Sequence, residues 1–454
     1  MWQSICSLDE ILQGLDGVFT EPSMRTHVEI LLGWLMCPGK RTEYKVFETI
    51  RADEPVRRDQ RHPFDRYYNF FSRSGWQACE LSREMARAVV GAVAPEGPLY
   101  LVVDDTLLHK QGKNVYGLGW FYDAVASTES RTVTAPGNNW VVLSIAIAAP
   151  GNPERYLCLP LLARLHLAGE EHPSCQDLAA EMIQQIAAWF PGREIVLVGD
   201  GGYSAHQLLD HLPAEADYVG RMRLDAELYD PQVPPQPKGK RGPKPRKGPR
   251  LPNPAEMARR ADRAKTTGKT RWRWRKIRIT VYGKRRTLWV LTKIVLWPKV
   301  CRLRPVLLVL IRDPEGKLRD TCLFTTRLEA DAEWVIQTYA RRYAIEQTFR
   351  SSKQYLQIEA PHHWCRQSIE KLAPWVWLTQ STVMLWYLTH GRTTPQAEAR
   401  RQRMGPWDSE WSFRHMLQTL RDAILDQTIT PMSEHQRDLR KFLELLKSCL
   451  KLAV

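Results

Sequence analysis

The stretch Leu99-Tyr-Leu-Val-Val-Asp-Asp-Thr106 predicts a short apolar strand that ends in two acids. A second stretch, Glu194-Ile-Val-Leu-Val-Gly-Asp-Gly-Gly-Tyr203, repeats this pattern and ends in Asp200 among glycines. Apolar runs without alternation are typical of strands that are covered on both faces of a sheet. Catalytic groups of open α/β sheets gather beyond the carboxyl ends of strands. Taken singly, each acid would equally suit a helix cap or a turn; together they predict an acidic site at a sheet edge.

The surrounding pattern favours a mixed α/β fold. We expect strands at 99–104, 140–148, 155–160, 194–199 and 217–223, with helices near 175–190 and 203–212. An early run of strands followed by a helix and another strand fits an RNase H-like sheet better than a strictly alternating order. Residues 1 to about 90, and the chain after about 330, are helical in pattern. Residues 271–312 return to strand character, and Gly283 suggests a hairpin turn.

A stripe of polar side chains occupies the stretch Tyr339-Ala-Arg-Arg-Tyr-Ala-Ile-Glu-Gln-Thr-Phe-Arg-Ser-Ser-Lys353. Tyr339, Arg342, Glu346 and Lys353 would share one face of a single helix at 3.6 residues per turn. Such a face is suited to holding a metal ion with its carboxylate and phosphates with its cations. The plainer interpretation is a solvated face, braced by Arg342 and Glu346 at i,i+4 spacing.

With these motifs the sequence resembles the DDE transposases of bacterial insertion sequences, in the insertion-sequence-four-like group with the signature Y-x2-R-x3-E-x6-K. The resemblance covers about residues 60 to 390. The signature is matched at every spacing by Tyr339, Arg342, Glu346 and Lys353, and the other two acids of the family by Asp105 and Asp200. It implies an RNase H-like catalytic core with helices on both faces of a mixed sheet, interrupted by a basic β-rich insertion.

The resemblance also implies a chemistry. Asp105, Asp200 and Glu346 would be the catalytic acids and the ligands of two Mg2+ or Mn2+ ions, which prefer oxygen ligands. Tyr339, Arg342 and Lys353 would bind phosphates beside the scissile bond. Within the doublet, Asp104 is the alternative first acid, because neighbouring strand residues point to opposite faces. Asp105 is preferred, since the family's acid is commonly followed by a small hydroxyl residue such as Thr106.

The positive charge of the chain is concentrated in one segment. The formal net charge is +15, but residues 238–286 hold 20 Lys and Arg against two acids, and the rest of the chain is nearly neutral. This distribution predicts a polyanionic partner at one place. The segment Pro231–Pro254 is rich in Pro and Gly and predicts an exposed basic loop. We expect its cations Lys244, Arg246, Lys247 and Arg250 to bind DNA.

Two tryptophans follow this loop. Trp272 and Trp274 alternate with Arg273 and Arg275, which would place aromatic and cationic side chains on opposite faces of a strand. Some relatives carry a Trp that stacks on DNA in an insertion between the second and third acids, so either tryptophan is a candidate DNA contact. The alternative is that both fill the core of the insertion.

The cysteines point to no metal site. The nine cysteines contain no C-x2-C pair, which favours a reducing cytoplasm over a disulfide framework. The amino terminus lacks a signal-peptide pattern, and the apolar stretch Leu372–Leu388 is better interpreted as a buried helix than as a membrane span. We therefore expect a cytoplasmic, nucleoid-associated protein without a membrane partner.

The sequence suggests five regions. They are a helical DNA-binding region (1–95), the first part of the core (96–225), the basic β-rich insertion (226–300), the second part of the core with the Glu helix (301–392) and a helical carboxyl-terminal region (393–454). The predicted function is cleavage and strand transfer of DNA at the ends of an insertion sequence, in a dimer that joins element ends and target. The alternatives are an inactive DNA-binding descendant of a transposase and a nuclease without strand transfer.

Overall fold

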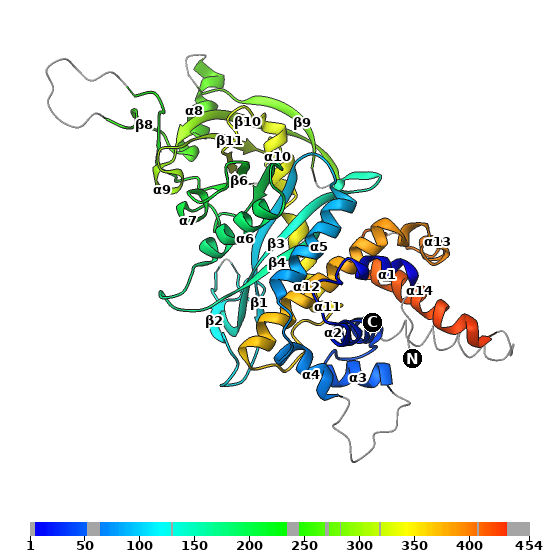
Figure 1. Cartoon of the computed structure of the whole chain (residues 1–454). Helices are drawn as coiled ribbons and strands as arrows, with labels where there is room; N and C mark the ends of the chain where they lie inside the picture. Colours follow the sequence, from blue (N-terminus) through cyan, green and yellow to red (C-terminus); the bar gives the residue numbers. More distant parts are fainter. Residues whose placement is uncertain are drawn as a thin grey trace.

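A computed structural model describes residues 5–51, 64–128, 130–233, 245–267, 272–281, 283–316, 319–405 and 408–433. The chain is a mixed α/β protein with one large mixed sheet and many helices, which confirms the predicted class (Figure 1). The strands are β1 (Leu99–His109), β2 (Gly119–Tyr122), β3 (Thr134–Ala149), β4 (Asn152–His166), β5 (Ile195–Val198), β6 (Ala216–Met222), β7 (Leu228–Tyr229), β8 (Arg250–Leu251), β9 (Arg275–Val281), β10 (Lys284–Leu296), β11 (Pro305–Arg312) and β12 (Thr321–Thr325).

The helices lie in the sequence both before and after the strands. They are α1 (Cys6–Gln13), α2 (Glu21–Met36), α3 (Glu43–Arg51), α4 (Asp65–Ser72), α5 (Ala78–Val93), α6 (Cys175–Trp189), α7 (His206–Leu209), α8 (Pro254–Thr267), α9 (Pro298–Cys301), α10 (Ala332–Ala340), α11 (Tyr343–Gln354), α12 (Arg366–Thr389), α13 (Pro395–Gln402) and α14 (Phe413–Ser433). A short 3-10 helix spans Gly391–Thr393.

The sheet is parallel where β1, β5 and β6 meet and antiparallel elsewhere among the described strands. Its order is β2-β3-β1-β5-β6-β12-β11-β10-β7-β8, with β4 paired to β3 and β9 paired to β10. The apolar run of β5 is fully buried, as its unbroken pattern predicts. β1 and β5 run side by side in the same direction, and Val102 pairs with Val198. Asp104 and Asp200 each lie two residues further on, Asp104 inside β1 and Asp200 in the loop after β5, so the two acids lie near each other.

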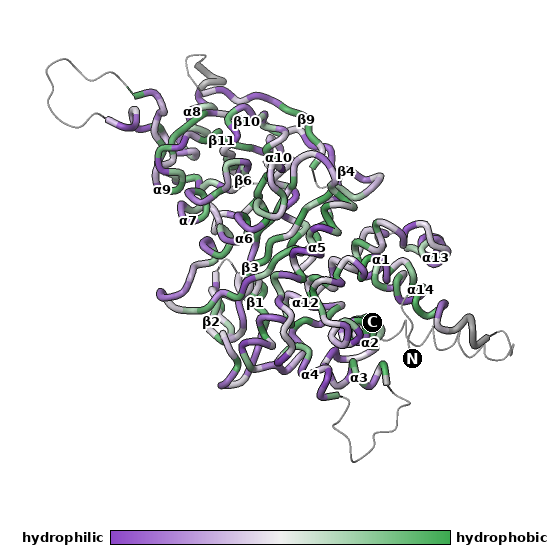
Figure 2. The backbone as a smooth tube through the Cα atoms, viewed as in Figure 1, coloured by the Kyte–Doolittle hydropathy of each residue, from purple (hydrophilic) through white to green (hydrophobic). Residues whose placement is uncertain are grey.

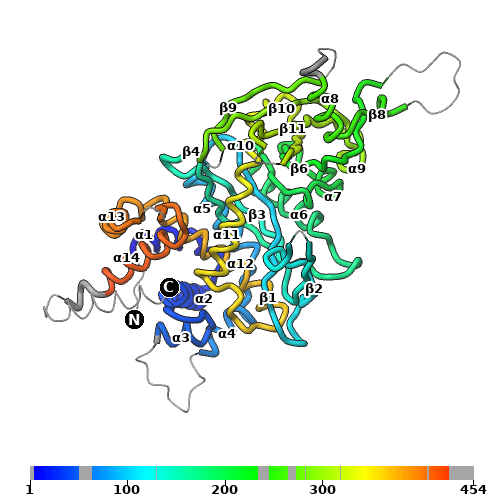
Figure 3. Tube along the Cα trace, turned by 180° about the vertical axis from the view of Figure 1, so that it is seen from behind, coloured from blue at the N-terminus to red at the C-terminus, as the bar shows by residue number. Residues whose placement is uncertain are grey.

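Helices cover the two faces of this sheet differently. Helices α5, α11 and α12 pack on β4 at one face, while α6 packs on β3 and β4. In the view from behind, α11 and α12 lie next to β1 and β3 (Figure 3). The predicted buried helix is α12, whose Trp375, Trp377 and Trp386 are at most 1% exposed.

The amino-terminal and carboxyl-terminal helices join around α12. Helices α1, α4 and α14 all pack on it, and α2 contacts α14. Hydrophobic segments gather along α12 and the central strands, whereas hydrophilic segments dominate the outer loops (Figure 2). The core is therefore continuous from the first helices to the sheet, and α12 is its centre.

Four local predictions need correction. The strand expected at 99–104 does not end at the acid doublet, because β1 stays paired with β3 up to His109. The signature stretch is not one helix, because α10 ends at Ala340 and α11 begins at Tyr343. The helix expected at 203–212 is limited to the single turn of α7. The Pro- and Gly-rich segment is not entirely loop, since it contains β8, which pairs with β7 just before the segment. The predicted hairpin turn is present between β9 and β10, where Gly283 has a φ of +69°.

Helices long and apolar enough to cross a membrane are absent from the part of the chain that the structure describes.

Candidate active site

The two acids of the β1 doublet face different partners. The Asp104 Oδ2 accepts a hydrogen bond from Arg342 Nη2 at 2.9 Å, on the side of α11. The Asp105 Oδ1 instead accepts from the Tyr203 hydroxyl at 3.0 Å, and its Oδ2 from Asn139 Nδ2 at 3.2 Å. This division follows from strand geometry, since successive side chains leave opposite faces of a sheet.

The second strand-end acid, Asp200, lies in a tight loop after β5. Its Oδ1 accepts from the backbone N–H of Gly202 at 2.7 Å and of Tyr203 at 3.3 Å. These bonds turn the chain back at once, so that the Tyr203 ring reaches Asp105. The other oxygen, Oδ2, lies 4.0 Å from Arg342 Nη2.

The third acid, Glu346, lies in the first turn of α11. Its Oε1 accepts from Arg342 Nη1 at 2.7 Å. The Arg342 guanidinium therefore contacts Asp104 and Glu346 directly and lies near Asp200, so three carboxylates from β1, the loop after β5 and α11 surround one cation. The side chain of Arg342 is 21% exposed, so these interactions are only partly screened by water.

The break between α10 and α11 sets the position of Arg342. The N–H groups of Arg341 and Arg342 bond the carbonyls three residues back, of Thr338 and Tyr339, at 3.2 and 3.1 Å. This tighter turn is of the 3-10 type. The neighbouring Arg341 lies over the rings of Tyr100 and Tyr156, 3.9 and 4.6 Å from their centres. Arg341 thus packs against aromatic rings, whereas Arg342 contacts the acids.

Burial changes the acidity of the doublet. Burial raises the pKa of Asp104 to about 7, against the opposing effect of Arg342. Burial also raises the pKa of Asp105, although the hydrogen bonds that Asp105 accepts from Asn139 and Tyr203 lower it. The negative charge of Asp200 adds to both increases. Arg342 conversely has a raised pKa, which burial opposes and the three acids and Tyr339 favour.

The last signature residue, Lys353, binds the protein itself. Its Nζ donates to the carbonyl of Leu107 at 2.6 Å and lies 3.7 Å from Glu359 Oε1. Glu359 also accepts from the His109 backbone N–H at 2.9 Å, and Lys110 Nζ donates to the Glu359 carbonyl at 2.9 Å. Glu359 was not predicted as a site residue, because a single Glu in a loop carries no pattern in the sequence.

Tyr339 is half-buried near the end of α10. It belongs to a different helix from Glu346, but its hydroxyl contributes to the electrostatic environment of Arg342. Arg342, Glu346 and Lys353 thus lie around β1 and α11. Tyr339 lies at the end of α10, near Arg342.

The predicted DNA contacts of the insertion divide into exposed cations and packed tryptophans. Arg246, Lys247 and Arg250 are exposed, and Lys247 lies over the Tyr229 ring at 3.5 Å. Lys244 lies outside the described residues.

Trp272 is 9% exposed and belongs to the core, as the alternative interpretation of the sequence would have it. Trp274 Nε1 donates to Asp262 at 3.0 Å, and Arg312 lies 4.9 Å from the centre of its ring. Both rings therefore pack against the protein in this structure. The structure holds no DNA, so their DNA contact stays a prediction.

The donor set at Arg342 suits a hard cation. Carboxylate oxygens are the ligands that Mg2+ and Mn2+ prefer, and a guanidinium marks the point between the acids where positive charge is stabilised. Among the described residues no three acidic, His or Cys side chains already form a closed metal cage. Asp104, Asp200 and Glu346 would hold an ion once Arg342 withdraws from between them.

Comparisons with known proteins give the class. A family model described as DDE superfamily endonuclease matches residues 14–284, which is more than half of the chain. The chain therefore belongs to the DDE superfamily endonucleases. The match includes the β1 doublet and Asp200 and ends before Glu346, so the third acid rests on the structure and the signature.

Among solved structures, the chain is similar to a cryo-EM structure of a piggyBac transposase synaptic complex with hairpin DNA. The identity is 10% and the TM-score 0.39, over 98% of this chain and 80% of that chain. We assign no residue role from this likeness. A comparison with curated proteins gives no match.

Proposed function

We propose that this DDE superfamily endonuclease is a transposase of the insertion-sequence-four-like group, which cleaves DNA at the ends of its element and joins them to a target. The observation that carries the proposal is the contact of Arg342 with Asp104 and Glu346, beside Asp200. Acids brought from three separate elements to one cation are what a carboxylate site for phosphodiester chemistry requires. An RNase H-like core, two protomers per complex and double-stranded DNA as partner belong to the same proposal.

The first acid of the proposed site is Asp104 rather than its neighbour. Asp104 shares Arg342 with Glu346, whereas Asp105 holds Tyr203 and Asn139 on the other side of the strand. The pattern of an acid followed by Thr favours Asp105, but geometry is the stronger argument because metal ligands must converge. Asp105 then acts as a positioning residue, which fixes the Asp200 loop through Tyr203.

Bound Mg2+ or Mn2+ would activate the attacking oxygen, stabilise the leaving oxygen and offset charge on the phosphate. The chain's own residues prepare this chemistry. Arg342 holds the three carboxylates together against their repulsion, and on DNA binding it can turn to a phosphate, which a guanidinium binds in bidentate fashion. Lys353 fixes α11, and hence Glu346, against β1 through the Leu107 carbonyl.

We propose that the insertion binds the DNA backbone. Arg246, Lys247 and Arg250 are exposed in a segment that carries most of the chain's positive charge. Lys244 belongs to the same group by sequence. Attraction to phosphates through such cations is independent of base sequence, so recognition of the element ends needs further contacts, for which the amino-terminal helices are the candidate.

The test is a cleavage and joining assay with DNA that spans both flanks of the gene. With Mg2+ or Mn2+, the wild-type protein should nick at the element ends and produce joined products, and Glu346→Gln should produce neither while still binding the ends. Cleavage without joining would identify a nuclease instead. Binding without cleavage under all metal conditions would identify an inactive DNA-binding descendant.

A further inference from the structure

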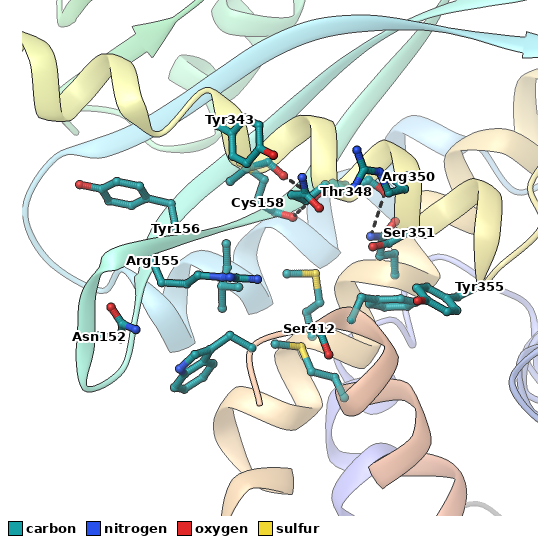
Figure 4. A pocket seen from close by; sticks show the side chains of 18 of the residues that line it. Asn152, Arg155, Tyr156, Cys158, Tyr343, Thr348, Arg350, Ser351, Tyr355 and Ser412 are labelled. Carbon is teal, nitrogen blue, oxygen red and sulfur yellow. Dashed lines mark hydrogen bonds between the residues drawn. The ribbon is translucent and has the colours of Figure 1, made fainter. Parts of the chain in front are cut away.

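A cavity of about 700 Å³ lies beside α11, next to the stripe of signature residues. Its walls come from the start of β4, from α11 and α12, and from the turn that leads into α14 (Figure 4). Helical spacing places Tyr343 and Gln347 within about a quarter turn of Glu346. Helix α11 therefore carries both Glu346 and part of the cavity wall, but none of the proposed catalytic residues lines the cavity.

The walls are rich in flat and polarisable side chains. Tyr156 and Tyr343 line one end of it, and Tyr355 lies across from Tyr156 (Figure 4). Trp411 and Phe413 also line the cavity and are 6% and 7% exposed. Aromatic walls favour a planar ligand, because stacking and apolar burial act on the same faces.

The lining of the cavity contains one buried polar atom without a partner among the described residues and one exposed cation. Gln380 is 1% exposed, and its Nε2 donates to the Thr348 carbonyl at 3.2 Å, so its Oε1 is the free atom. A buried acceptor without a donor costs roughly 1–3 kcal/mol. Arg155 is exposed at the start of β4, and its side chain extends into the space between the strand and the helices (Figure 4).

These features define the ligand by its chemistry. It is planar, it donates an N–H to Gln380 Oε1, and it carries an anionic group for Arg155. Glu154, which also lines the mouth, is exposed and would repel an anion placed near it, so the anion must lie on the Arg155 side. A nucleotide has all three properties, since its base supplies a flat face and N–H groups and its phosphate supplies the charge.

We propose that this cavity is a nucleotide-binding site, with the base between the aromatic walls and the phosphate on Arg155. The proposal rests on the proposed function only in that the chain handles DNA. The same chemistry is offered by a free nucleotide and by one nucleotide of a DNA strand that passes the acids. A cavity of this volume accommodates either, because ligand sites of about 300–1,000 Å³ hold molecules of nucleotide size.

The experiment uses the full chain with EDTA, so that no cleavage can occur and failure of the catalytic proposal cannot affect the result. The probes are 2-aminopurine deoxyribonucleoside 5′-monophosphate and a single-stranded trinucleotide with 2-aminopurine in the middle. Stacking on aromatic rings should quench the fluorescence of the base in a saturable titration. Saturation by the monophosphate indicates a site for free nucleotides, and saturation by the trinucleotide alone indicates a strand-borne nucleotide.

Variants decide whether the cavity is the place of binding. Arg155→Gln and Gln380→Met should each weaken binding about tenfold, as expected for one lost charged or buried hydrogen bond. Tyr343→Ala, a half-exposed position, tests the wall without risk to the core. Arg87→Gln, an exposed arginine on α5 far from the cavity in sequence, is the matched control and should bind as the wild type.

The phosphate can be tested separately. The 2-aminopurine deoxynucleoside without phosphate should bind the wild type about tenfold more weakly than the monophosphate, and Arg155→Gln should remove that difference. The proposal is overturned if neither probe gives a saturable titration, or if Arg155→Gln and Tyr343→Ala both bind with wild-type affinity. These two surface variants keep the test valid even if Gln380→Met does not fold.

Discussion

Arg342 Nη2 lies 2.9 Å from Asp104 Oδ2, although 238 residues separate the two in the sequence. The same guanidinium bonds Glu346 at 2.7 Å. Arg342 is thus both a member of the signature and the counterion of the acids.

The first concerns the β1 doublet. Asp104→Asn should reduce metal-dependent DNA cleavage roughly a thousandfold, because a lost metal ligand removes several kcal/mol of transition-state stabilisation. Asp105→Asn should retain activity within about tenfold, since it weakens only the hydrogen bonds that position Tyr203. Cleavage rates in Mg2+ measure both, with circular dichroism as the control for folding. Full activity in Asp104→Asn and none in Asp105→Asn would move the ligand assignment by one residue.

The second prediction concerns Arg342 as an internal counterion. Arg342→Gln should lower the free energy of unfolding by about 3 kcal/mol in EDTA, because it leaves partly buried carboxylates facing one another. Added Mn2+ should then raise the melting temperature more in the variant than in the wild type, since the ion replaces the lost charge and binds only the folded state. Arg350→Gln, an exposed position on the same helix, is the control. Equal Mn2+ effects in both variants would contradict the role.

The third prediction concerns the basic insertion. Replacing Lys244, Arg246, Lys247 and Arg250 together by Gln should weaken binding to all DNA sequences. It should also flatten the dependence of log affinity on log salt by up to about 0.9 per lost contact. Fluorescence anisotropy over a range of salt measures the slope. The control is the double variant Arg83→Gln, Arg87→Gln on α5. An unchanged slope in the fourfold variant would indicate that the amino-terminal helices, and not the insertion, bind the DNA phosphates.

The fourth prediction separates packing from DNA contact in the two tryptophans. Trp272→Ala should lower the free energy of unfolding by roughly 3–5 kcal/mol, since the ring is 9% exposed. Trp274→Phe should cost only about 0.5–1.5 kcal/mol, because it removes one hydrogen bond to Asp262, which keeps Arg312 as a partner, and it keeps a ring for Arg312. Chemical denaturation measures both. A loss of strand joining with unchanged stability would instead identify a base-stacking tryptophan.

The fifth prediction concerns pH. Burial lowers the pKa of His27 to about 3 from an ordinary 6.5, and its Nδ1 accepts from Trp375 Nε1 at 3.0 Å. The unfolded chain binds the proton between these values and the folded chain does not, so this contribution is complete above pH 6.5 and is lost as the pH falls toward 3.

The loss should be about 1.4 kcal/mol per pH unit within that window. His27→Gln keeps an acceptor for Trp375 but cannot titrate. Denaturation at pH 7, 6 and 5 should therefore show a smaller fall in stability for the variant than for the wild type. The same fall in both would show that other groups dominate.

Much of the fold could be predicted from local pattern. The apolar runs of β1 and β5, the helical ends of the chain and the hairpin at Gly283 follow from periodicity and turn chemistry. The break between α10 and α11 could not be predicted, because no Pro or Gly marks it. At this break Arg341 contacts the rings of Tyr100 and Tyr156, which are remote in the sequence.

The sequence by itself determined that this chain carries acids directly after two apolar runs, a signature of Tyr, Arg, Glu and Lys, and a segment of concentrated positive charge. Alternation along β1 also required Asp104 and Asp105 to face opposite sides of the sheet. Only the tertiary structure decided which side α11 covers, and therefore which acid meets Arg342. It alone revealed Glu359 beside Lys353 and the unpaired Gln380 in the cavity. The reason is that contacts across the sheet join segments far apart along the chain, and no local pattern records them.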